Sequence, residues 1–269
     1  VLITTNSGIN WVSLLSEYSL RYLNIHFMDS QTGFLSALNI QTNYAIILKT
    51  TNGGQNWFEY NTAIDGYEIN NIRFVNSETG YCAGSSFNNL FVIKTTNGGV
   101  NWIESPAFYN SFTPNNFHFE NLNTGYISSS SKLLKTTNGG NNWFTLVNCN
   151  SVQSSYFQND SSFFLADAYS RIFLTNDNGE NFDTLIGKNN HILNRVQAVS
   201  ENNIWCNGYN SSNYKSTNSG LNWFYDNNSN SLNIRYVVFS NANTGFSIAG
   251  RGTIMKTTTG GVPIGIQQI

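Results

Sequence analysis

The sequence predicts an all-β protein, a single β-propeller built from four-stranded blades, and two observations carry that prediction. An eight-residue string recurs along the chain, and its successive starts lie 46, 45, 41, 39, 41 and 41 residues apart. The composition, with 45 asparagines and only 3 prolines among 269 residues, favours tight turns between short strands over helices. Four-stranded repeats of about 40 to 45 residues are typical of propellers.

We call the recurring string the box repeat; it reads Thr/Ser-x-Asn/Asp-x-Gly-x-x-Trp/Phe. Six full copies are marked by their third and eighth residues: Asn6 and Trp11, Asn52 and Trp57, Asn97 and Trp102, Asn138 and Trp143, Asp177 and Phe182, and Asn218 and Trp223. A seventh copy, at residues 257–261, keeps the start and lacks the aromatic residue. We expect the polar residues to bond backbone amides within a turn and the aromatic residue to pack between neighbouring blades.

A second recurring string predicts the remaining strands. It places a polar residue between two apolar ones and continues to Thr-Gly-aromatic, as in Ile25–Phe27 followed by Thr32–Phe34. Each unit therefore predicts four strands, of which Asn24–Met28, Gly33–Leu38, Ala45–Thr50 and Asn56–Tyr60 are the first set. The box repeat lies on the turn between the third and fourth strands. Because one such sheet cannot bury both faces, we expect the units to stack radially.

Seven box repeats and six first strands leave the number of blades at six or seven. Residues 1–11 look like the third and fourth strands of a unit without its first two strands. The seven boxes favour a ring of seven blades, one of which is incomplete or shared. The alternative is a ring of six blades in which Ile9–Ser16 supplies the closing strand of the last blade. We expect the propeller to cover residues 1–261. Residues 262–269 are then a tail, a closing strand or the start of a linker.

The box repeat resembles the Asp-box, or bacterial neuraminidase repeat, with asparagine in place of aspartate in most copies. The longer string Lys-Thr-Thr-Asn-Gly-Gly-x-Asn-Trp, after a Thr-Gly-Tyr or Thr-Gly-Phe strand, resembles two groups of propellers. These are the photosystem II assembly and stability factor group and the repeat proteins secreted by Bacteroidetes-like bacteria. The resemblance covers essentially the whole chain. It implies that the box residues are structural, lie at the periphery of the propeller and take no part in catalysis.

Charge and hydropathy exclude two classes of partner. Only 10% of the residues are charged and the formal net charge is -2, so no basic surface is expected that could bind nucleic acid. No run of 18 apolar residues is present, so no membrane span is predicted. Cys82 and Cys206 hold matching places in different repeats and Cys149 has no counterpart, so we expect three unpaired thiols.

No catalytic or metal-binding pattern stands out. The histidines, His26, His118 and His191, have no close cluster of cysteines or aspartates, so neither a metal nor a cofactor is predicted. Sialidases share the Asp-box and hold their substrate with three arginines, but the Phe-Arg-Ile-Pro segment of that family is absent. The 15 acidic residues are scattered, whereas glycosidases need two carboxyl groups across a cleft. We therefore predict that the protein is not an enzyme.

Two sets of residues are candidates for binding. One position of the first strands carries varied, mostly polar residues, namely His26, Arg73, His118, Tyr156, Gln197 and Val238. They form either a binding surface beside the central channel or satisfied polar groups between blades. The second set lies in the loops that lead from a fourth strand to the next first strand, and comprises Tyr67, Phe108, Tyr109 and Phe112. These aromatic residues either stack on sugars and contact proteins, or tuck against the blades.

The function predicted from these observations is that of a bacterial protein, secreted or held at the cell surface. It would be a non-catalytic propeller that serves as an interaction, adhesion or extracellular structural module, with a protein or a glycan as partner. The alternative is a glycan-binding protein or a sialidase-like glycoside hydrolase. The incomplete terminal units also suggest self-assembly by exchange of terminal strands, because unpaired strand edges recruit partners. An ordinary ring closed within one chain is the other interpretation of those ends.

Overall fold

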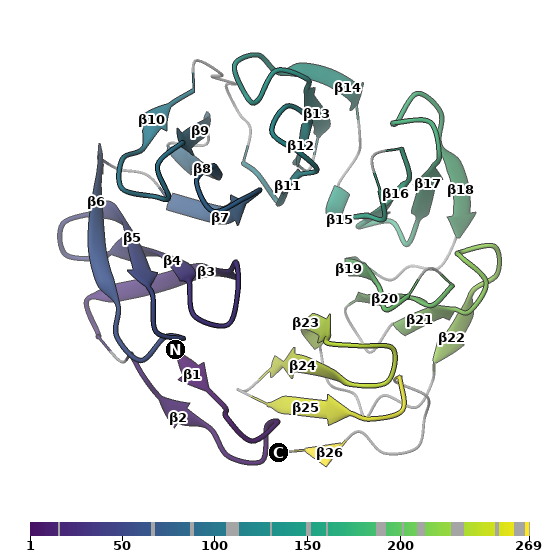
Figure 1. The fold of residues 1–269 in the computed structure, drawn as a ribbon. Coiled ribbons are helices and arrows are strands. Elements are labelled where there is room, and N and C mark those ends of the chain that lie inside the picture. Colours follow the sequence, from purple (N-terminus) through teal and green to yellow (C-terminus); the bar gives the residue numbers. More distant parts are fainter. Residues whose placement is uncertain are drawn as a thin grey trace. The chain divides into compact units, whose positions relative to one another are not determined.

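The fold class predicted from the repeats is confirmed by the computed structural model. It describes residues 1–15, 17–65, 68–86, 89–105, 113–129, 131–148, 152–159, 161–186, 192–200, 202–208, 213–226, 234–250, 253–260 and 267–268. Over these residues the chain is all-β, with six four-stranded antiparallel sheets that are the blades of a β-propeller (Figure 1). The chain divides into two compact units. No helix in this part of the chain is long and apolar enough to cross a membrane.

The first unit, Val1–Thr5 with Asn10–Asn148, contains three blades. Blade 1 consists of β3 (Leu20–Phe27), β4 (Gly33–Asn39), β5 (Tyr44–Thr50) and β6 (Phe58–Asp65). Blade 2 consists of β7 (Glu68–Phe74), β8 (Gly80–Ser86), β9 (Asn89–Thr95) and β10 (Ile103–Glu104). Blade 3 consists of β11 (Asn116–Phe119), β12 (Gly125–Ser128), β13 (Lys132–Thr136) and β14 (Phe144–Asn148). In each blade the four strands follow one another in chain order, as the repeats predict.

The second unit, Asn6–Ile9 with Cys149–Ile269, contains the other three blades. Blade 4 consists of β15 (Val152–Phe157), β16 (Phe163–Asp167), β17 (Ile172–Thr175) and β18 (Asp183–Ile186). Blade 5 consists of β19 (Leu193–Ala198), β20 (Ile204–Gly208), β21 (Asn213–Ser216) and β22 (Phe224–Asp226). Blade 6 consists of β23 (Ile234–Phe239), β24 (Gly245–Ala249), β25 (Ile254–Thr257) and β26 (Gln267–Gln268). Since β26 pairs with β25, the fourth strand of blade 6 comes from the end of the same chain and not from Ile9–Ser16.

The described residues 1–15 form a two-stranded sheet. β1 (Leu2–Ile3) pairs antiparallel with β2 (Val12–Ser13), with Leu2 opposite Ser13 and Ile3 opposite Val12. The first box repeat joins these strands, so they correspond to the third and fourth strands of a blade. The described residues thus form six four-stranded blades rather than seven, and the first box repeat lies in an additional two-stranded sheet.

Local hydrogen bonds explain why the box repeat folds as a turn. In blade 1 the Thr50 hydroxyl donates to Asn52 Oδ1 at 2.9 Å and accepts the backbone N–H of Gly54 at 2.9 Å. Asn52 Oδ1 also accepts the N–H of Asn56 at 2.9 Å. The boxes that begin at Thr95, Thr136, Thr175 and Ser216 make the same three bonds. Side chains thus satisfy the amides that the tight turn leaves unpaired.

Two of the box aromatic residues, Trp102 and Trp143, pack between blades. Trp143 is buried among residues of blades 2 and 3, and Trp102 packs against the cluster shared by blades 1 and 2. Gly99 explains why the fifth box position is glycine. Its φ is +84°, and a Cβ there would lie 2.6 Å from the ring of Phe34 on the preceding blade. The turn of one blade therefore approaches its neighbour too closely for a side chain.

Candidate functional site

The polar column of the first strands is divided by the structure. His26 is the last but one residue of β3 and Arg73 the last but one of β7, and both line one hollow of the first unit. Tyr156, near the end of β15, lines a second hollow in the second unit. His118 instead pairs its Nε2 with Glu120 Oε2 at 3.0 Å, and the Oε1 atom of Gln197 is buried without a hydrogen-bond partner among the described residues. Equivalent positions of the column therefore have different surroundings within each unit.

The first hollow measures about 340 Å³ and lies between the ends of two consecutive first strands. Its walls are the end of β3 with the following loop, and the end of β7 with the following loop. The lining residues are His26, Phe27, Met28, Asp29, Arg73, Phe74, Val75, Asn76 and Ser77. The His26 ring stacks on Phe74 with the centroids 6.5 Å apart, so aromatic contact across the two blades holds the imidazole in place.

The charges in this hollow are set by burial and by hydrogen bonds. Burial, and then the nearby charge of Arg73, lower the pKa of His26 to about 4, so its imidazole is neutral at neutral pH. Arg73 is exposed and makes no ion pair with another described residue. The Asp29 carboxylate accepts the backbone N–H groups of Gln31 and Thr32 at 2.7 and 2.8 Å, which lowers its pKa. The hollow thus offers one guanidinium that is not neutralised by a bonded carboxylate.

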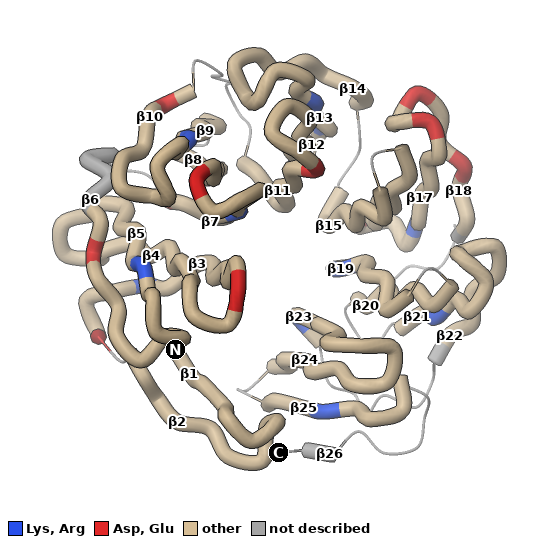
Figure 2. Tube along the Cα trace, in the orientation of Figure 1, with Lys and Arg blue, Asp and Glu red and all other residues tan. Residues whose placement is uncertain are grey.

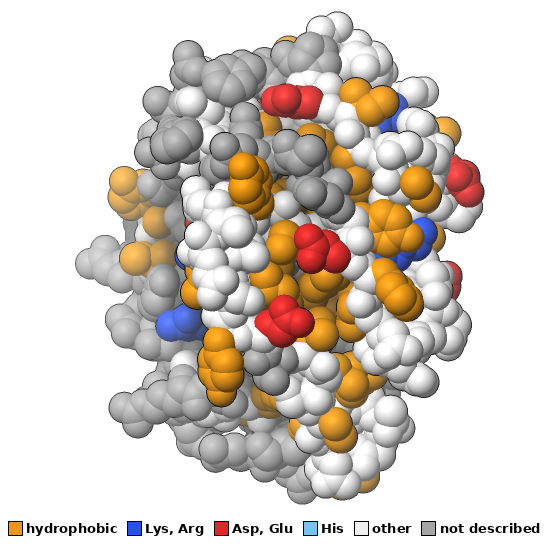
Figure 3. All heavy atoms as spheres, turned by 90° about the vertical axis from the view of Figure 1, so that its left-hand side faces the viewer, with side chains coloured by type: hydrophobic (Ala, Val, Ile, Leu, Met, Phe, Trp, Pro, Cys, Tyr) orange, Lys and Arg blue, Asp and Glu red, His pale blue; other side chains and the backbone are white. Residues whose placement is uncertain are grey.

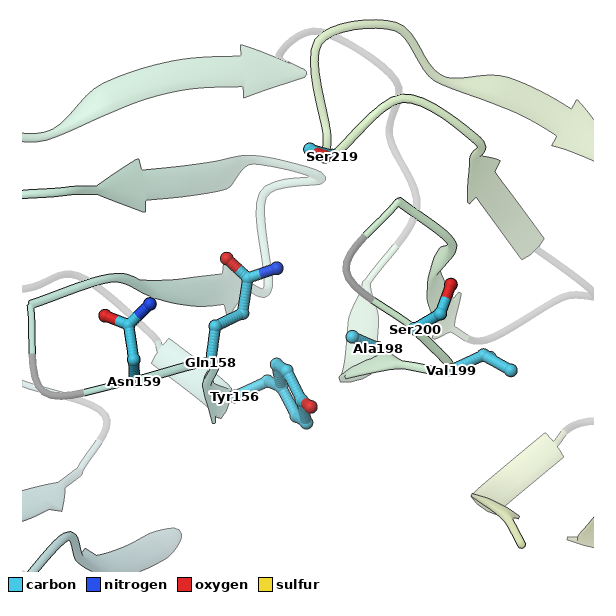
Figure 4. A pocket seen from close by; sticks show the side chains of 7 residues that line it. All are labelled: Tyr156, Gln158, Asn159, Ala198, Val199, Ser200 and Ser219. Carbon is cyan, nitrogen blue, oxygen red and sulfur yellow. The ribbon is translucent and has the colours of Figure 1, made fainter. Parts of the chain in front are cut away.

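The second hollow measures about 350 Å³ and occupies the matching place between blades 4 and 5. Tyr156 lies near the end of β15, and Gln158 and Asn159 lie in the loop after it. Ala198 ends β19, Val199 and Ser200 follow it, and Ser219 belongs to the box turn of blade 5. Figure 4 shows the Tyr156 ring pointing toward the segment of Ala198 and Val199. Burial raises the pKa of Tyr156, so its hydroxyl stays protonated. Amide and hydroxyl groups line this hollow where the first has charged ones.

The sequence analysis missed Asp29, Asn76, Gln158 and Asn159 as lining residues. A signal was present, because Asp or Asn recurs three residues before the Thr or Ser that leads into the second strand. In that position the side chain caps the loop, as when Asn76 Oδ1 accepts the N–H of Thr79 at 2.7 Å. The loop is therefore held rigidly at the edge of each hollow. Such loops present their other atoms in a fixed arrangement.

Several predicted residues fall elsewhere. Tyr67, Phe108, Tyr109 and Phe112 lie outside the described residues, as do His191 and Cys149. Cys82 and Cys206 are free and buried, as expected, and burial raises the pKa of both thiols. Within the described part of the chain, no three His, Cys, Asp or Glu side chains gather as they would to bind a metal.

The two hollows also bear on the alternative of an enzyme. A sialidase-like site needs three converging arginines, and other glycosidases need two carboxyl groups about 5 to 10 Å apart. Among the described lining residues, the first hollow has one arginine and one carboxylate, and the second has neither. Figure 2 shows the charged residues dispersed along the chain. The described lining residues of the two hollows offer hydrogen-bonding groups and one exposed cation, the guanidinium of Arg73.

A further surface feature lies on the fourth strands. The residue that follows the box aromatic is apolar and exposed in the β1–β2 sheet and in four blades, at Val12, Phe58, Ile103, Phe144 and Phe224. Blade 4 has Asp183 there. Figure 3 shows hydrophobic side chains gathered on the side of the molecule that carries β6. The box repeat therefore places one aromatic residue between blades and leaves the next residue in solvent.

Comparison with known proteins identifies the fold. No protein-family model and no curated protein matches the chain. Among solved structures, YCF48 from Cyanidioschyzon merolae matches with a TM-score of 0.75 at 14% identity, covering 96% of this chain and 88% of that one. YCF48 bound to D1 peptide matches with a TM-score of 0.52 at 18% identity, covering 90% and 93%. The GH74 enzyme of Niastella koreensis matches with a TM-score of 0.69 at 14% identity, covering 88% of this chain and 43% of that one. At these identities the likeness is one of fold, and the chain shares the β-propeller architecture of YCF48 and the GH74 enzymes.

Proposed function

We propose that the protein is a non-catalytic propeller that binds a polypeptide partner in the hollows between the ends of its first strands. The first hollow carries the proposal, because the exposed guanidinium of Arg73 lies there beside the neutral imidazole of His26 and two phenylalanine rings. A partner side chain with a carboxylate would pair with the guanidinium, and an apolar side chain next to it would pack on the phenylalanine rings. The second hollow, with amides and hydroxyls, fits the polar groups of a peptide backbone.

Two further observations support this function. The solved structure of YCF48 bound to D1 peptide shows that a propeller of this fold takes a peptide ligand. Only 10% of the residues are charged and 45 are asparagine, which matches the composition of secreted bacterial repeat proteins that the sequence resembles. On this ground we propose a location outside the cell or at the cell surface. Fractionation of the cells that produce it, with antibody detection in medium, envelope and cytosol, tests this location, and recovery from the cytosol alone would refute it.

Selection from a library of random peptides displayed on phage tests the peptide-binding function. Wild-type protein should enrich peptides with Asp or Glu next to an apolar residue, and Arg73→Gln should abolish that enrichment. Arg21→Gln is the matched control, because Arg21, on β3 of blade 1, is exposed like Arg73 but pairs with Glu68 outside the hollow. Equal enrichment by wild type and Arg73→Gln, or no enrichment by either, contradicts the proposal.

The second candidate function is glycan binding or glycan hydrolysis, and the likeness to GH74 enzymes favours it. Asp29 is the one carboxylate among the described lining residues of the two hollows. A glycan array and a panel of chromogenic glycosides distinguish this function from peptide binding. Hydrolysis that is lost in Asp29→Asn would replace the non-catalytic proposal with a glycosidase, whereas array signals without hydrolysis would indicate a lectin.

A further inference from the structure

Three polar side chains of blade 5 each have a buried atom that makes no hydrogen bond with another described residue. They are Arg195 and Gln197 on β19 and Trp205 on β20, and the atoms are Arg195 Nε, Gln197 Oε1 and Trp205 Nε1. Buried polar groups of folded proteins almost always have a hydrogen-bond partner, so each exception needs an explanation. Here three exceptions occur on two adjacent strands of one blade.

The strand register places these three side chains next to one another. Arg195 and Gln197 are two positions apart, and the irregularity of β19 lies before Arg195, so both side chains point to the same face of the sheet. Gln197 lies directly opposite Trp205, and side chains paired in this way have Cβ atoms about 4.5 to 5.5 Å apart. We call the three residues the polar cluster of blade 5.

The polar cluster of blade 5 faces blade 6, within the second unit. β19 and β20 lie beside β23 (Figure 1). The guanidinium carbon of Arg195 lies 3.9 Å from the centroid of the Tyr236 ring, and the Trp205 ring stacks on Phe239 with the centroids 6.4 Å apart. Both aromatic partners belong to β23. The three buried atoms therefore lie in the seam between two consecutive blades.

This seam is packed less closely than the equivalent seams of the first unit. There the second-strand aromatic residues Phe34 and Tyr81 stack on the first strand of the next blade with centroid distances of 4.0 and 3.7 Å. Trp205 holds the equivalent place on β20, and its ring lies 6.4 Å from that of Phe239. Phe34 and Tyr81 are fully buried, whereas Trp205 is partly exposed. A small ligand can therefore approach the polar cluster of blade 5 from solvent.

The charge of this part of the molecule is not balanced. The described side chains of blades 5 and 6 include the cations Arg195, Lys215, Arg235 and Lys256 and no carboxylate. Arg195 makes no ion pair with another described residue. Burial lowers its pKa, because the surroundings disfavour the charged form. A cation that is removed from water in this way is stabilised by a bound anion.

We propose that the polar cluster of blade 5 binds a carboxylate in the seam between blades 5 and 6. The carboxylate oxygens accept hydrogen bonds from Arg195 Nε and Trp205 Nε1. A half-turn of the Gln197 amide exchanges Oε1 and Nε2 and supplies a third donor. One guanidinium balances the single charge of a carboxylate. A phosphate dianion needs a second cation, and the nearby Lys215 already donates to the carbonyl of Gly260. The site is separate from the hollows of the proposed function and does not depend on them.

Titration with acetate tests the proposal. Sodium acetate replaces sodium chloride at constant ionic strength and neutral pH, and heteronuclear NMR of the isotope-labelled chain follows the indole N–H signals. The signal of Trp205 is identified by its loss in Trp205→Phe. We expect this signal to shift saturably with acetate, while those of the other tryptophans stay in place. Inorganic phosphate in the same titration should bind at least fivefold more weakly than acetate.

Variants of the protein complete the test. Arg195→Gln should weaken acetate binding at least tenfold, whereas Arg235→Gln, which removes the same charge at an exposed position of β23, should leave it unchanged. Trp205→Phe keeps a ring on Phe239 and removes only the indole donor, so the rise in Tm that acetate gives the wild type should fall by at least half. This second variant carries the test if Arg195→Gln does not fold. Absence of a saturable shift, equal affinity of wild type and Arg195→Gln, an equal rise in Tm of wild type and Trp205→Phe, or tighter binding of phosphate than of acetate overturns the proposal.

Discussion

Lys49 joins two consecutive blades through a single hydrogen bond of 2.7 Å, from its Nζ to the carbonyl oxygen of Gly98. The same Nζ lies 5.3 Å from the centroid of the Phe34 ring on its own blade. The ammonium group therefore connects the third strand of blade 1, a second-strand aromatic residue and the box turn of blade 2. The repeat brings this Lys to the same place on several blades, which makes it a regular element of blade packing.

Lys49→Met should lower the free energy of unfolding by about 1 to 2 kcal/mol, because a partly buried, charge-assisted hydrogen bond and a cation–π contact are lost. Methionine keeps most of the aliphatic volume. Urea denaturation followed by tryptophan fluorescence measures the change. Lys132→Met is the matched control, since Lys132 begins a third strand and its side chain has no bond with another described residue. A similar loss in both variants would contradict the role given to Lys49.

Thr95→Val should destabilise the protein by about 1 to 3 kcal/mol, although valine has almost the shape of threonine. The buried Thr95 hydroxyl accepts the N–H of Gly99 at 3.0 Å and donates to Asn97 Oδ1 at 2.9 Å, and valine leaves that buried N–H unpaired. Thr96→Val, one residue later at an exposed position, is the control and should change stability by less than about 0.5 kcal/mol. Thermal unfolding of both variants gives the comparison, and an unaffected Thr95→Val would show that the box turn does not depend on this hydroxyl.

His26 should make stability depend on pH between about 4 and 6.5. Its pKa is 6.5 in an ordinary environment and about 4 in the folded protein, mainly because burial disfavours the charged form. The unfolded chain therefore binds the proton first, so the contribution of His26 is fully present above pH 6.5 and is lost as the pH falls toward 4. The His26→Gln variant should show a flatter decline of stability over this range.

Proton NMR of the imidazole gives the direct test. The titration midpoint of His26 should lie near 4 in the wild type and rise in Arg73→Gln, because a nearby positive charge is removed. A wild-type midpoint near 6.5 would show that the imidazole is solvated and that the hollow does not hold it as described.

The repeats predicted the fold because the interactions that build it are local or periodic. The bonds of the box repeat join residues at most four positions apart, such as Thr50 and Gly54, so eight letters of sequence contain the whole turn. Phe74 stacks on Phe34 and Phe119 stacks on Tyr81 at equivalent places of the repeat, so the recurring aromatic residues marked the strands in the sequence. Even the incomplete first sheet followed from counting boxes against first strands.

The hollows were predicted only in part, because their composition depends on residues of different blades. Asp29 and Arg73 share a hollow although 44 positions separate them, and nothing in either repeat shows which loop atoms face the gap. His118 occupies the same column as His26 but pairs with Glu120, so equal sequence position did not give equal environment. Ile25 and Phe27 are 47% and 40% exposed although they match, in sequence, the buried first-strand residues of blades 2 and 3, so the sequence did not show their exposure.

Trp143→Ala should cost about 3 to 5 kcal/mol of unfolding free energy, the usual range for a buried large aromatic residue. The indole is buried with residues of blades 2 and 3 and meets the edge of the Phe119 ring at a centroid distance of 5.9 Å. The control is Phe144→Ala at the next residue, the first of β14, where the side chain is exposed and its loss should change stability by less than about 1 kcal/mol. Denaturant unfolding at constant pH measures both variants. Truncating a well-packed ring leaves a cavity that the neighbouring blades cannot refill, and this cavity is the cause of the expected loss. A loss below about 1 kcal/mol in Trp143→Ala would therefore show that the box aromatic does not hold the blades together.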